Sequence, residues 1–266
     1  MIVSQITSGL GNQLFQYAAA RRLAEYHHTP FKLDLSWFNM QNFREYGLNH
    51  FQIIENIASN EEIEYAKQQN LIKEKHFHFN PEILQANPPL YLSGYWQSER
   101  YFKDIEAIIH QEFTIKYPLN EANQQIAEKI QNCEAVSIHI RRSDYLVNLN
   151  HGVCWLDYYD RAVDFISSMV TNAFFVVFSD DSQWVTNNLN LKYPNLLVSI
   201  NNASTAYFDL YLMSLCKYHI IANSTFSWWG AWLSQKPGKI VIAPRRWFYA
   251  LSHNTCDLIP ESWTIM

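Results

Sequence analysis

Arginine and hydroxyl side chains follow directly after two apolar runs of the chain, and this combination suits the binding of a phosphate group. Arg141 and Arg142 follow the run 135–140, and Ser224 stands two residues after the run 218–222. The planar fork of arginine matches the oxygens of a diphosphate, and the N–H groups at the start of a helix also attract anions. We therefore expect a ligand that carries phosphate.

The two adjacent arginines are expected to have different roles, because neighbouring residues at the end of a strand point to different sides. We predict that one binds phosphate and that a carboxylate such as Asp144 holds the other. A surface ion pair is the alternative for any Arg-Arg-x-Asp sequence. The apolar residues that precede the arginines, 136–140, favour an inner location and therefore a functional role.

Ser179, Asp180 and Asp181 follow a third apolar run, 174–178, and three interpretations of them stay open. These side chains can cap the helix that follows. The aspartate pair can also hold Mg²⁺ bridged to phosphates. Alternatively, a carboxylate can accept the N1–H and N2–H₂ donors of a guanine base. The sequence does not separate these roles, and capping is compatible with either ligand.

A hydroxyl cluster stands at the predicted start of a later helix. Its members are Asn223, Ser224, Thr225 and Ser227. Plain N-capping accounts for one of these residues but not for the whole cluster, so we predict an anion site here.

A glycine pair, Gly9 and Gly11, follows the first apolar run of the chain. Glycines allow a backbone to approach a ligand closely, although a tight turn needs glycine even without a ligand. Asn12 and Gln13 add polar side chains to the same turn and favour the ligand interpretation.

The elements that must position these residues alternate between strands and helices, which indicates βαβ units and parallel sheets. In such sheets ligands bind outside the carboxyl ends of the strands. The predicted strands are 2–6, 31–35, 91–96, 135–140, 173–178, 196–199, 218–222 and 239–243, and the predicted helices are 12–28, 60–69, 100–110, 120–131, 157–169, 182–189, 207–215 and 226–234. We predict two lobes, residues 1–118 and residues 119–266, of which the second is doubly wound.

Composition narrows the class of protein. Hydrophobic residues make up 48% and charged residues 17% of the 266 residues, a balance typical of a folded protein. The net charge of -5 argues against binding to duplex nucleic acid. The four cysteines are widely spaced, which indicates reduced thiols and neither a zinc cluster nor a disulfide framework. The sequence shows no signal peptide and no membrane-spanning run, so we expect a cytoplasmic protein.

Four segments, taken together and in order, resemble the signature of the bacterial α-1,2-fucosyltransferase family. They are Gly9–Ala18, His139–Tyr145, Phe178–Asp181 and Ser224–Ala231, and the resemblance extends from Met1 to about Phe248. It implies a GT-B-like α/β fold, with two Rossmann-type lobes and a donor cleft between them. It also implies an inverting transfer of L-fucose from GDP-β-L-fucose to the 2-hydroxyl of galactose, with no metal and no cofactor.

The resemblance implies a role for each polar cluster. Residues 1–118 would form the acceptor side and residues 119–266 the GDP-fucose side. Arg141 would hold the donor diphosphate, and Arg142 would support its loop. The implied catalytic residues are Arg141, Asp144 and Asn12; the implied donor-binding residues are Gly11, Gln13, His139, Arg142, Tyr145, Ser179, Asp180, Asp181, Asn223, Ser224, Thr225 and Ser227.

Within this set, His139 and the aspartate pair would face guanine. Asp144 is the first candidate for the general base, and an ion pair with one of the arginines is its alternative role. The sequence departs from the family pattern at Ser8 and Ser143, where the family usually has glycine.

The implied partners are GDP-fucose and a galactose-terminated oligosaccharide or lipid-linked glycan, as in O-antigen or lipopolysaccharide biosynthesis, and no nucleic acid. Peripheral attachment to the inner face of the membrane stays open, and nothing indicates an oligomeric state. Three other functions also stay open. They are a transferase that uses another GDP-sugar, a noncatalytic carbohydrate-binding protein, and a metal-dependent nucleotide-sugar hydrolase built on the aspartate pair.

Overall fold

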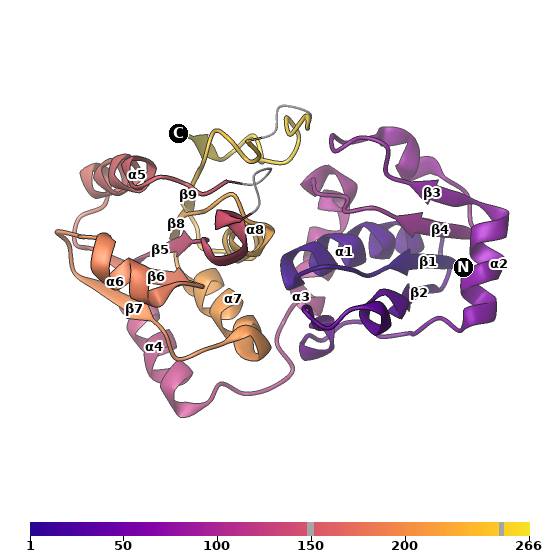
Figure 1. Ribbon diagram of the computed structural model, residues 1–266, viewed down its shortest axis with the longest axis horizontal. Coiled ribbons are helices and arrows are strands. Elements are labelled where there is room, and N and C mark those ends of the chain that lie inside the picture. Colours follow the sequence, from indigo (N-terminus) through magenta and orange to yellow (C-terminus); the bar gives the residue numbers. More distant parts are fainter. Residues whose placement is uncertain (148–151, 250–252) are drawn as a thin grey trace. The chain divides into compact units, whose positions relative to one another are not determined.

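The computed structural model describes residues 1–147, 152–249 and 253–266, and divides the chain into two compact α/β units. Unit 1 comprises Met1–Tyr117 with His253–Pro260, and unit 2 comprises Pro118–Ser252 with Glu261–Met266. Figure 1 shows the elements of both units.

Unit 1 is built on a four-stranded parallel sheet with the strand order β2-β1-β4-β3. Its strands are β1 (Ile2–Gln5), β2 (Phe31–Asp34), β3 (Leu71–Lys73) and β4 (Leu90–Ser93), and its α-helices are α1 (Leu10–Tyr26), α2 (Asn60–Gln69) and α3 (Glu106–Glu112). Ile2 of the central strand β1 pairs with Phe31 on one side and with Leu90 on the other. The carboxyl end of β1 therefore lies in the middle of the sheet edge.

Unit 2 is built on a six-stranded parallel sheet with the order β10-β9-β8-β5-β6-β7. Its strands are β5 (Glu134–Ile140), β6 (Ala173–Ser179), β7 (Asn195–Val198), β8 (Tyr218–Ile220), β9 (Ile240–Ala243) and β10 (Thr264–Ile265), and its α-helices are α4 (Glu121–Gln131), α5 (Leu156–Met169), α6 (Ser182–Asn188), α7 (Ala206–Leu215) and α8 (Thr225–Trp232). The chain winds outward from β5 through β6 to β7, and then returns to the other side of β5 through β8 and β9. This reversal places a topological switch point between β5 and β8.

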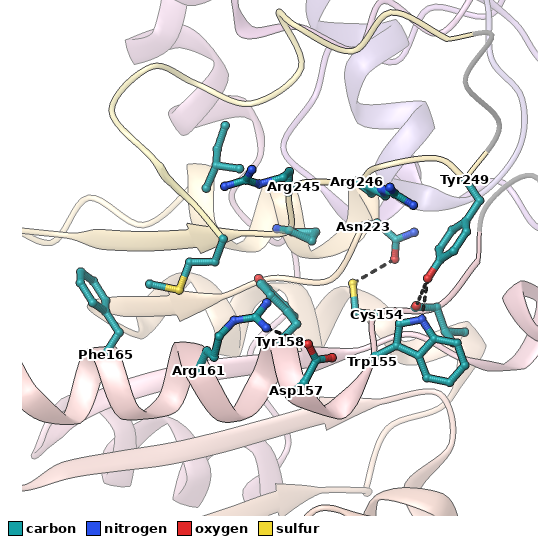
Figure 2. A pocket seen from close by; sticks show the side chains of 14 residues that line it. Cys154, Trp155, Asp157, Tyr158, Arg161, Phe165, Asn223, Arg245, Arg246 and Tyr249 are labelled. Carbon is teal, nitrogen blue, oxygen red and sulfur yellow. Dashed lines mark hydrogen bonds and ion pairs between the residues drawn. The ribbon is translucent and has the colours of Figure 1, made fainter.

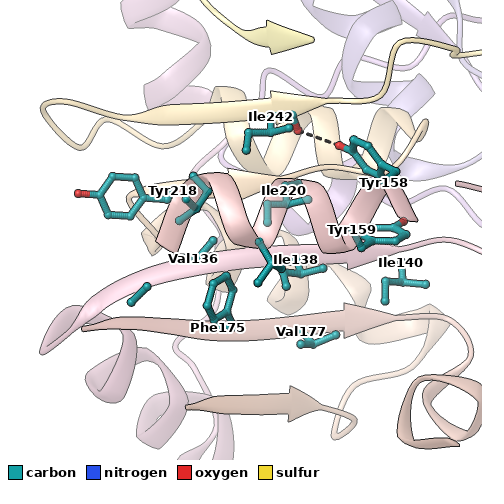
Figure 3. Packing of buried hydrophobic residues seen from close by; sticks show 14 of the residues in the cluster. Val136, Ile138, Ile140, Tyr158, Tyr159, Phe175, Val177, Tyr218, Ile220 and Ile242 are labelled. Atoms are coloured by element: carbon teal, nitrogen blue, oxygen red, sulfur yellow. Dashed lines mark hydrogen bonds between the residues drawn. The ribbon is translucent and has the colours of Figure 1, made fainter. Parts of the chain in front are cut away.

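Alternation along β5 sends its side chains to two different helical layers. Val136, Ile138 and Ile140 pack against α5 together with Phe175 of β6, as Figure 3 shows. Ala135 packs on the opposite face with buried residues of α4 and α7. Both faces of this sheet are therefore covered, which explains why its strands read as continuous apolar runs.

The structure contains every predicted strand and helix within one or two residues at most boundaries. The main exception is the predicted helix 100–110, where two short 3₁₀ turns, Glu99–Tyr101 and Lys103–Ile105, precede α3. The strands β3 and β10 are additions to the predicted set. They are only three and two residues long and lie at the edges of their sheets, so they lack the long apolar signal of a central strand.

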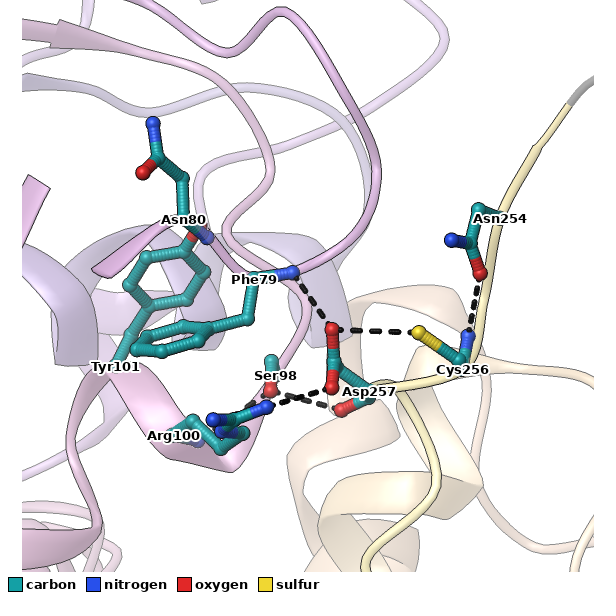
Figure 4. A network of polar contacts seen from close by, with 8 residues as sticks. All are labelled: Phe79, Asn80, Ser98, Arg100, Tyr101, Asn254, Cys256 and Asp257. Atoms are coloured by element: carbon teal, nitrogen blue, oxygen red, sulfur yellow. Dashed lines mark hydrogen bonds and ion pairs between the residues drawn. The ribbon is translucent and has the colours of Figure 1, made fainter. Parts of the chain in front are cut away.

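The predicted division at residue 118 differs from the structure in one segment, His253–Pro260, which packs with unit 1. Asp257 anchors this segment, because its carboxylate accepts the N–H of Phe79 at 3.1 Å and pairs with Arg100 at 2.8 Å. Its carbonyl oxygen also accepts the hydroxyl of Ser98 at 2.7 Å (Figure 4). Three separate contacts to unit 1 explain why a continuous boundary drawn from sequence misses this return of the chain.

Candidate functional site

The switch point of unit 2 brings two of the predicted clusters to one sheet edge. Arg141 follows β5, and Ser224 follows the neighbouring strand β8 and precedes α8. A ring contact links the two segments, since the centroids of His139 and Phe226 lie 5.6 Å apart. The loop that begins at Arg141 and the amino end of α8 are thus neighbours at the position where open α/β sheets bind ligands.

Two carboxylates hold the guanidinium of Arg141. Its Nη2 lies 2.7 Å from Oδ1 of Asp144, and its Nε lies 3.3 Å from Oδ2 of Asp180. The ring of Tyr145 lies beside the guanidinium, 5.5 Å from centroid to carbon. Within the described residues, Nη1 of Arg141 makes no hydrogen bond. The fork is therefore fixed in direction while one nitrogen stays available to an anion.

Arg142 contacts α6 and the segment after β6. Its guanidinium lies 3.7 Å from the centroid of the Trp184 ring in α6, and its Nε lies 3.5 Å from Oδ2 of Asp181. Its backbone N–H donates to Asp180 at 2.9 Å. Arg142 thus faces the α6 side of the sheet, which matches the expected opposite directions of two adjacent side chains.

Asp181 caps a helix, and both aspartates form ion pairs with arginines. Asp181 caps α6 by accepting the N–H of Trp184 at 3.0 Å, and its own N–H donates to the hydroxyl of Ser179 at 3.0 Å. Asp180 accepts from the backbone of Arg142, and its carbonyl accepts the hydroxyl of Ser143 at 3.2 Å. Of the three interpretations, capping is the one that the contacts contain, and one oxygen of each carboxylate faces an arginine side chain.

His139 is buried and neutral. Burial in the sheet, together with the charge of Arg141, lowers the pKa of its imidazole to about 3. Its Nδ1 has no hydrogen-bond partner among the described residues, although the atom is shielded from solvent. An unpaired buried polar atom costs ~1–3 kcal/mol, and native structures retain few of them. His139 is therefore an unusual residue near the end of β5, two residues before the fixed Arg141.

The amino end of α8 is not capped by the side chain of Ser224, although this residue occupies the N-cap position. Ser227 does not contribute to such a site. It is buried, and its hydroxyl donates to the carbonyl oxygens of Ala222 and Ser224. The predicted phosphate contacts thus reduce to Ser224 and Thr225, with Ser227 as a packing residue of the turn.

Asn223, predicted to bind the donor, instead joins three segments of unit 2. Its side-chain amide donates to the carbonyl oxygens of Gly152 at 3.2 Å and Trp247 at 3.0 Å, and its Oδ1 accepts from the thiol of Cys154 at 3.5 Å. It is 1% exposed. These bonds hold the segments around Gly152, Asn223 and Trp247 together.

In unit 1, Gln13 is also a structural residue and not the predicted ligand contact. It is fully buried, and its amide donates to the carbonyl oxygens of Ser8 at 2.8 Å and Glu45 at 2.9 Å. Its Oε1 accepts the N–H of Gly47 at 2.8 Å. These bonds attach the turn at Gly9 and Gly11 to Glu45 and Gly47, more than thirty residues away from Gln13. The spacing of residues in the sequence cannot reveal such a distant partner.

Asn12 lies in the first turn of α1, next to the buried Gly11. Its Oδ1 accepts from Nε2 of Gln97 at 2.9 Å, which brings the segment after β4 beside the glycine turn. Gln97 and the preceding Trp96 are additions to the predicted set. Trp96 is buried and has a positive φ of 56°, which is rare for a bulky side chain and is a mark of constrained backbone. The one sequence signal for this segment is Gly94, inside the predicted strand 91–96.

A pocket of about 880 Å³ opens in unit 2 between α5 and the ends of β8 and β9. Figure 2 shows Arg161, Arg245 and Arg246 with the aromatic side chains of Trp155 and Tyr249 around it. Of the predicted site residues, Asn223 alone lines it. No sequence pattern indicates this pocket, because its residues come from segments as far apart as Val153 and Met266.

The family of the chain follows from comparison with known proteins. A profile of the family described as Glycosyl transferase family 11 matches residues 5–264. The chain belongs to glycosyl transferase family 11. It is therefore a glycosyltransferase, and the resemblance to α-1,2-fucosyltransferases noted in the sequence is confirmed.

Two bacterial relatives match this family 11 chain along its whole length. An alpha-1,2-colitosyltransferase of Escherichia coli is 31% identical over 99% of this chain and 98% of that protein. The O-antigen biosynthesis glycosyltransferase WbnK of Escherichia coli is 35% identical over 98% of each. A galactoside alpha-(1,2)-fucosyltransferase 1 of Rattus norvegicus is 28% identical over 56% of this chain and 43% of that protein.

The fold also has a solved counterpart. The structure of NodZ alpha-1,6-fucosyltransferase soaked with GDP-fucose is similar with a TM-score of 0.54, at 13% identity, over 87% of this chain and 91% of that chain. This likeness and the two parallel-sheet units confirm the predicted α/β, GT-B-like fold. Among the described residues, no helix has the length and apolar character needed to cross a membrane.

Proposed function

We propose that this family 11 enzyme transfers L-fucose from GDP-β-L-fucose to the 2-hydroxyl of a galactose residue, with inversion to an α-1,2 linkage. The observation that carries the donor assignment is Arg141, which two carboxylates orient while its Nη1 makes no bond in the described residues. The amino end of α8, which the Ser224 side chain leaves uncapped, lies on the neighbouring strand end. Together these groups supply positive charge for a diphosphate.

In the proposed reaction, the bond between the anomeric carbon of fucose and the β-phosphate oxygen breaks, and its electron pair stays on GDP. The acceptor oxygen forms the new bond to the anomeric carbon, and its proton passes to a base. Negative charge therefore grows on the β-phosphate as the sugar becomes oxocarbenium-like. Arg141 and the α8 amino end stabilise that charge without reorganising, because the fork is already fixed.

Asp144 has two candidate roles, general base and holder of Arg141. Its Oδ1 lies 2.7 Å from Nη2 of Arg141, which supports the holding role. The variant Asp144→Asn separates the two. A holder should mainly weaken donor binding, seen as a raised KM for GDP-fucose. A base should depress kcat and leave donor binding intact, because its proton transfer occurs only in the reaction.

The remaining site assignments are parts of the same proposal. Ser224 and Thr225 contact phosphate at the start of α8, and His139 lies under the nucleotide with its uncharged ring. Asn12 and Gly11 form the acceptor-side edge of unit 1. Asp180 and Ser179 complete the loop that holds Arg141, and Tyr145 covers its guanidinium. Asp181 and Arg142 fix the same loop to α6.

Fucose and colitose are the two donor sugars to separate, since a relative is named for each. Colitose is L-fucose without its 3-hydroxyl. We expect transfer from GDP-fucose to a β-galactoside, with product linkage determined by NMR after incubation with GDP-fucose, GDP-colitose or GDP-mannose. Transfer from GDP-colitose alone, or from GDP-mannose alone, would refute the fucose assignment and leave the diphosphate site intact.

We further propose that catalysis needs no metal ion, because arginine and the helix end supply the charge that a cation would otherwise provide. Transfer should persist in EDTA and gain less than about twofold from added Mg²⁺. Loss of activity in EDTA that Mg²⁺ restores would assign the metal role to the aspartate pair. The expected acceptor is a galactose-terminated oligosaccharide or lipid-linked glycan, used in the cytoplasm or at the inner face of the membrane.

A further inference from the structure

The pocket beside α5 is a different place from the Arg141 group. The hydroxyl of Tyr158 in α5 donates to the carbonyl oxygens of Ile221 at 2.8 Å and Ile242 at 3.1 Å, and so fixes the helix to the ends of β8 and β9. The pocket therefore lies on the α5 face of the sheet. His139 packs on the other face against Phe226. The nucleotide site proposed above does not use the α5 pocket.

Arginine side chains give the α5 pocket a positive charge. Arg245 and Arg246 come just after β9, and both are exposed. Neither forms an ion pair with any residue in the described part of the chain. A third arginine, Arg161, pairs with Asp157 at 2.7 Å, so these two lining charges offset each other. The pair after β9 is thus the excess charge of the pocket, and it suits an anion.

Aromatic rings form another wall of the α5 pocket, as Figure 2 shows. Nε1 of Trp155 donates to the hydroxyl of Tyr249 at 2.6 Å, which joins the two rings edge to edge. The Tyr249 ring lies directly on Gly152, where a Cβ atom would meet the ring at 2.0 Å and where φ is +65°. Only glycine permits this close approach. Trp155 nevertheless stays 66% exposed, so a broad apolar face is available.

We infer that the α5 pocket binds an anionic saccharide, namely the charged part of the acceptor glycan. This inference rests on the proposed function. Flat aromatic faces pack against the C–H surfaces of a pyranose ring, and Arg245 and Arg246 pair with a phosphate or carboxylate attached to the glycan. The volume of about 880 Å³ accommodates a ligand the size of a charged disaccharide. The arginines stand at the carboxyl edge of the same sheet that holds Arg141, so one glycan can extend from this pocket toward the donor side.

Three matched acceptors test the inference in the full chain, with GDP-fucose saturating. They are lactose, lactose 1-phosphate, and the disaccharide in which glucuronate replaces the reducing glucose. At least one anionic acceptor should have a KM about tenfold or more below that of lactose. The anionic acceptor with the lower KM shows whether the pocket prefers phosphate or carboxylate. An equal KM for all three acceptors would overturn the inference.

The double variant Arg245→Ala/Arg246→Ala should raise the KM of the preferred anionic acceptor to that of lactose. The KM of lactose and the KM of GDP-fucose should stay within about twofold of the parent values. A raised KM for GDP-fucose would overturn the inference by assigning these arginines to the donor. No transfer by the parent enzyme to any of the three acceptors, with donor binding intact, would count against the proposed function instead.

A matched control removes the same charge from the opposite edge of the sheet. Lys192 and Lys236 are exposed and precede β7 and β9, at the amino ends of the strands. The variant Lys192→Ala/Lys236→Ala should leave all KM values unchanged, whereas equal loss of anionic preference would show a general charge effect and would overturn the site. Trp155→Phe keeps a flat ring and should retain the preference, and Trp155→Ala should raise the KM of all three acceptors.

Discussion

The carboxyl edges of the two parallel sheets carry different kinds of side chain. In unit 1 the glycine turn is held by neutral amides, above all Gln13, whose hydrogen bonds reach Ser8, Glu45 and Gly47. In unit 2 the turn after β5 is held by ion pairs among Arg141, Asp144 and Asp180.

The two turns differ in whether the groups that hold them carry charge. An amide network fixes backbone without placing net charge at the sheet edge. An ion-pair network fixes the direction of a charged group that a ligand can use. Similar topology in the two units thus carries a turn held by neutral amides in one and a turn held by ion pairs in the other. Variants and changes of pH that act on one turn and not on the other test this contrast.

Acid should destabilise unit 2 through two buried histidines. Burial lowers the pKa of His139 and of His219 to about 3, whereas an unfolded histidine titrates near 6.5. Between these values the unfolded state binds more protons, so stability is present above pH 6.5 and is lost as pH falls toward 3. We expect up to ~2.7 kcal/mol of lost unfolding free energy per pH unit from the two groups. Urea denaturation from pH 7 to pH 4.5 measures it.

Asp209 supplies a control of opposite sign within unit 2. Burial raises the pKa of its carboxyl to about 6, so its contribution is present below the unfolded value of 3.8 and is lost as pH rises through 6. The variant Asp209→Asn should be more stable than the parent at pH 7.5 and should lose stability more steeply on acidification. A flat pH profile in both proteins would contradict the histidine account.

Arg141→Ala should be the largest catalytic loss among single variants. A charge-assisted contact in the transition state is worth ~1.5–3 kcal/mol, which corresponds to roughly 10- to 150-fold in kcat/KM. Calorimetry with GDP should show weaker binding as well. Arg142→Ala is the matched control, because that side chain packs on Trp184 and should affect stability more than donor binding. Near-normal transfer by Arg141→Ala would refute the donor assignment.

Gln13→Ala should destabilise unit 1 by about 2 kcal/mol. The change leaves buried backbone groups of Ser8, Glu45 and Gly47 without their partner, and such unpaired groups cost ~1–3 kcal/mol. Gln13→Glu keeps the size but adds a charge at a fully buried position, so it should be worse still. Thermal unfolding measures both variants. If Gln13→Ala keeps the parent melting temperature but fails to bind donor, the structural role is wrong.

Ser8→Gly should have the smallest effect, a gain within about 1 kcal/mol. Ser8 has a φ of 66°, a left-handed conformation that costs a residue with a Cβ atom ~1–2 kcal/mol, and the greater freedom of glycine in the unfolded chain offsets part of this gain. Gly9→Ala is the comparison, since its φ is −77° and a Cβ atom there would meet nothing within 4 Å. Lost activity in a stable Gly9→Ala protein would place a ligand against this turn.

Most strands and helices could be predicted from the sequence, because hydrophobic periodicity and helix-breaking residues are local properties of the chain. The apolar character of the runs 135–140 and 218–222 predicted two strands, and all these residues are buried in the structure. The polar residues after the two runs could therefore be placed at one edge of the sheet. The same logic missed β3 and β10, whose short exposed edges carry little apolar signal. The four polar segments also indicated the family, because residue types in a fixed order along the chain are enough to mark it.

The hydrogen-bond partners of the polar side chains could not be predicted, because they depend on contacts between distant segments. Gln13 and Asn223 have the residue types of a binding site, yet their side chains form hydrogen bonds to remote partners such as Gly47 and Trp247. The tertiary structure also assigned residues 253–260 to unit 1 and formed the α5 pocket from distant segments. Residue type and local conformation are properties of the sequence, whereas burial and hydrogen-bond partners depend on segments brought together by folding.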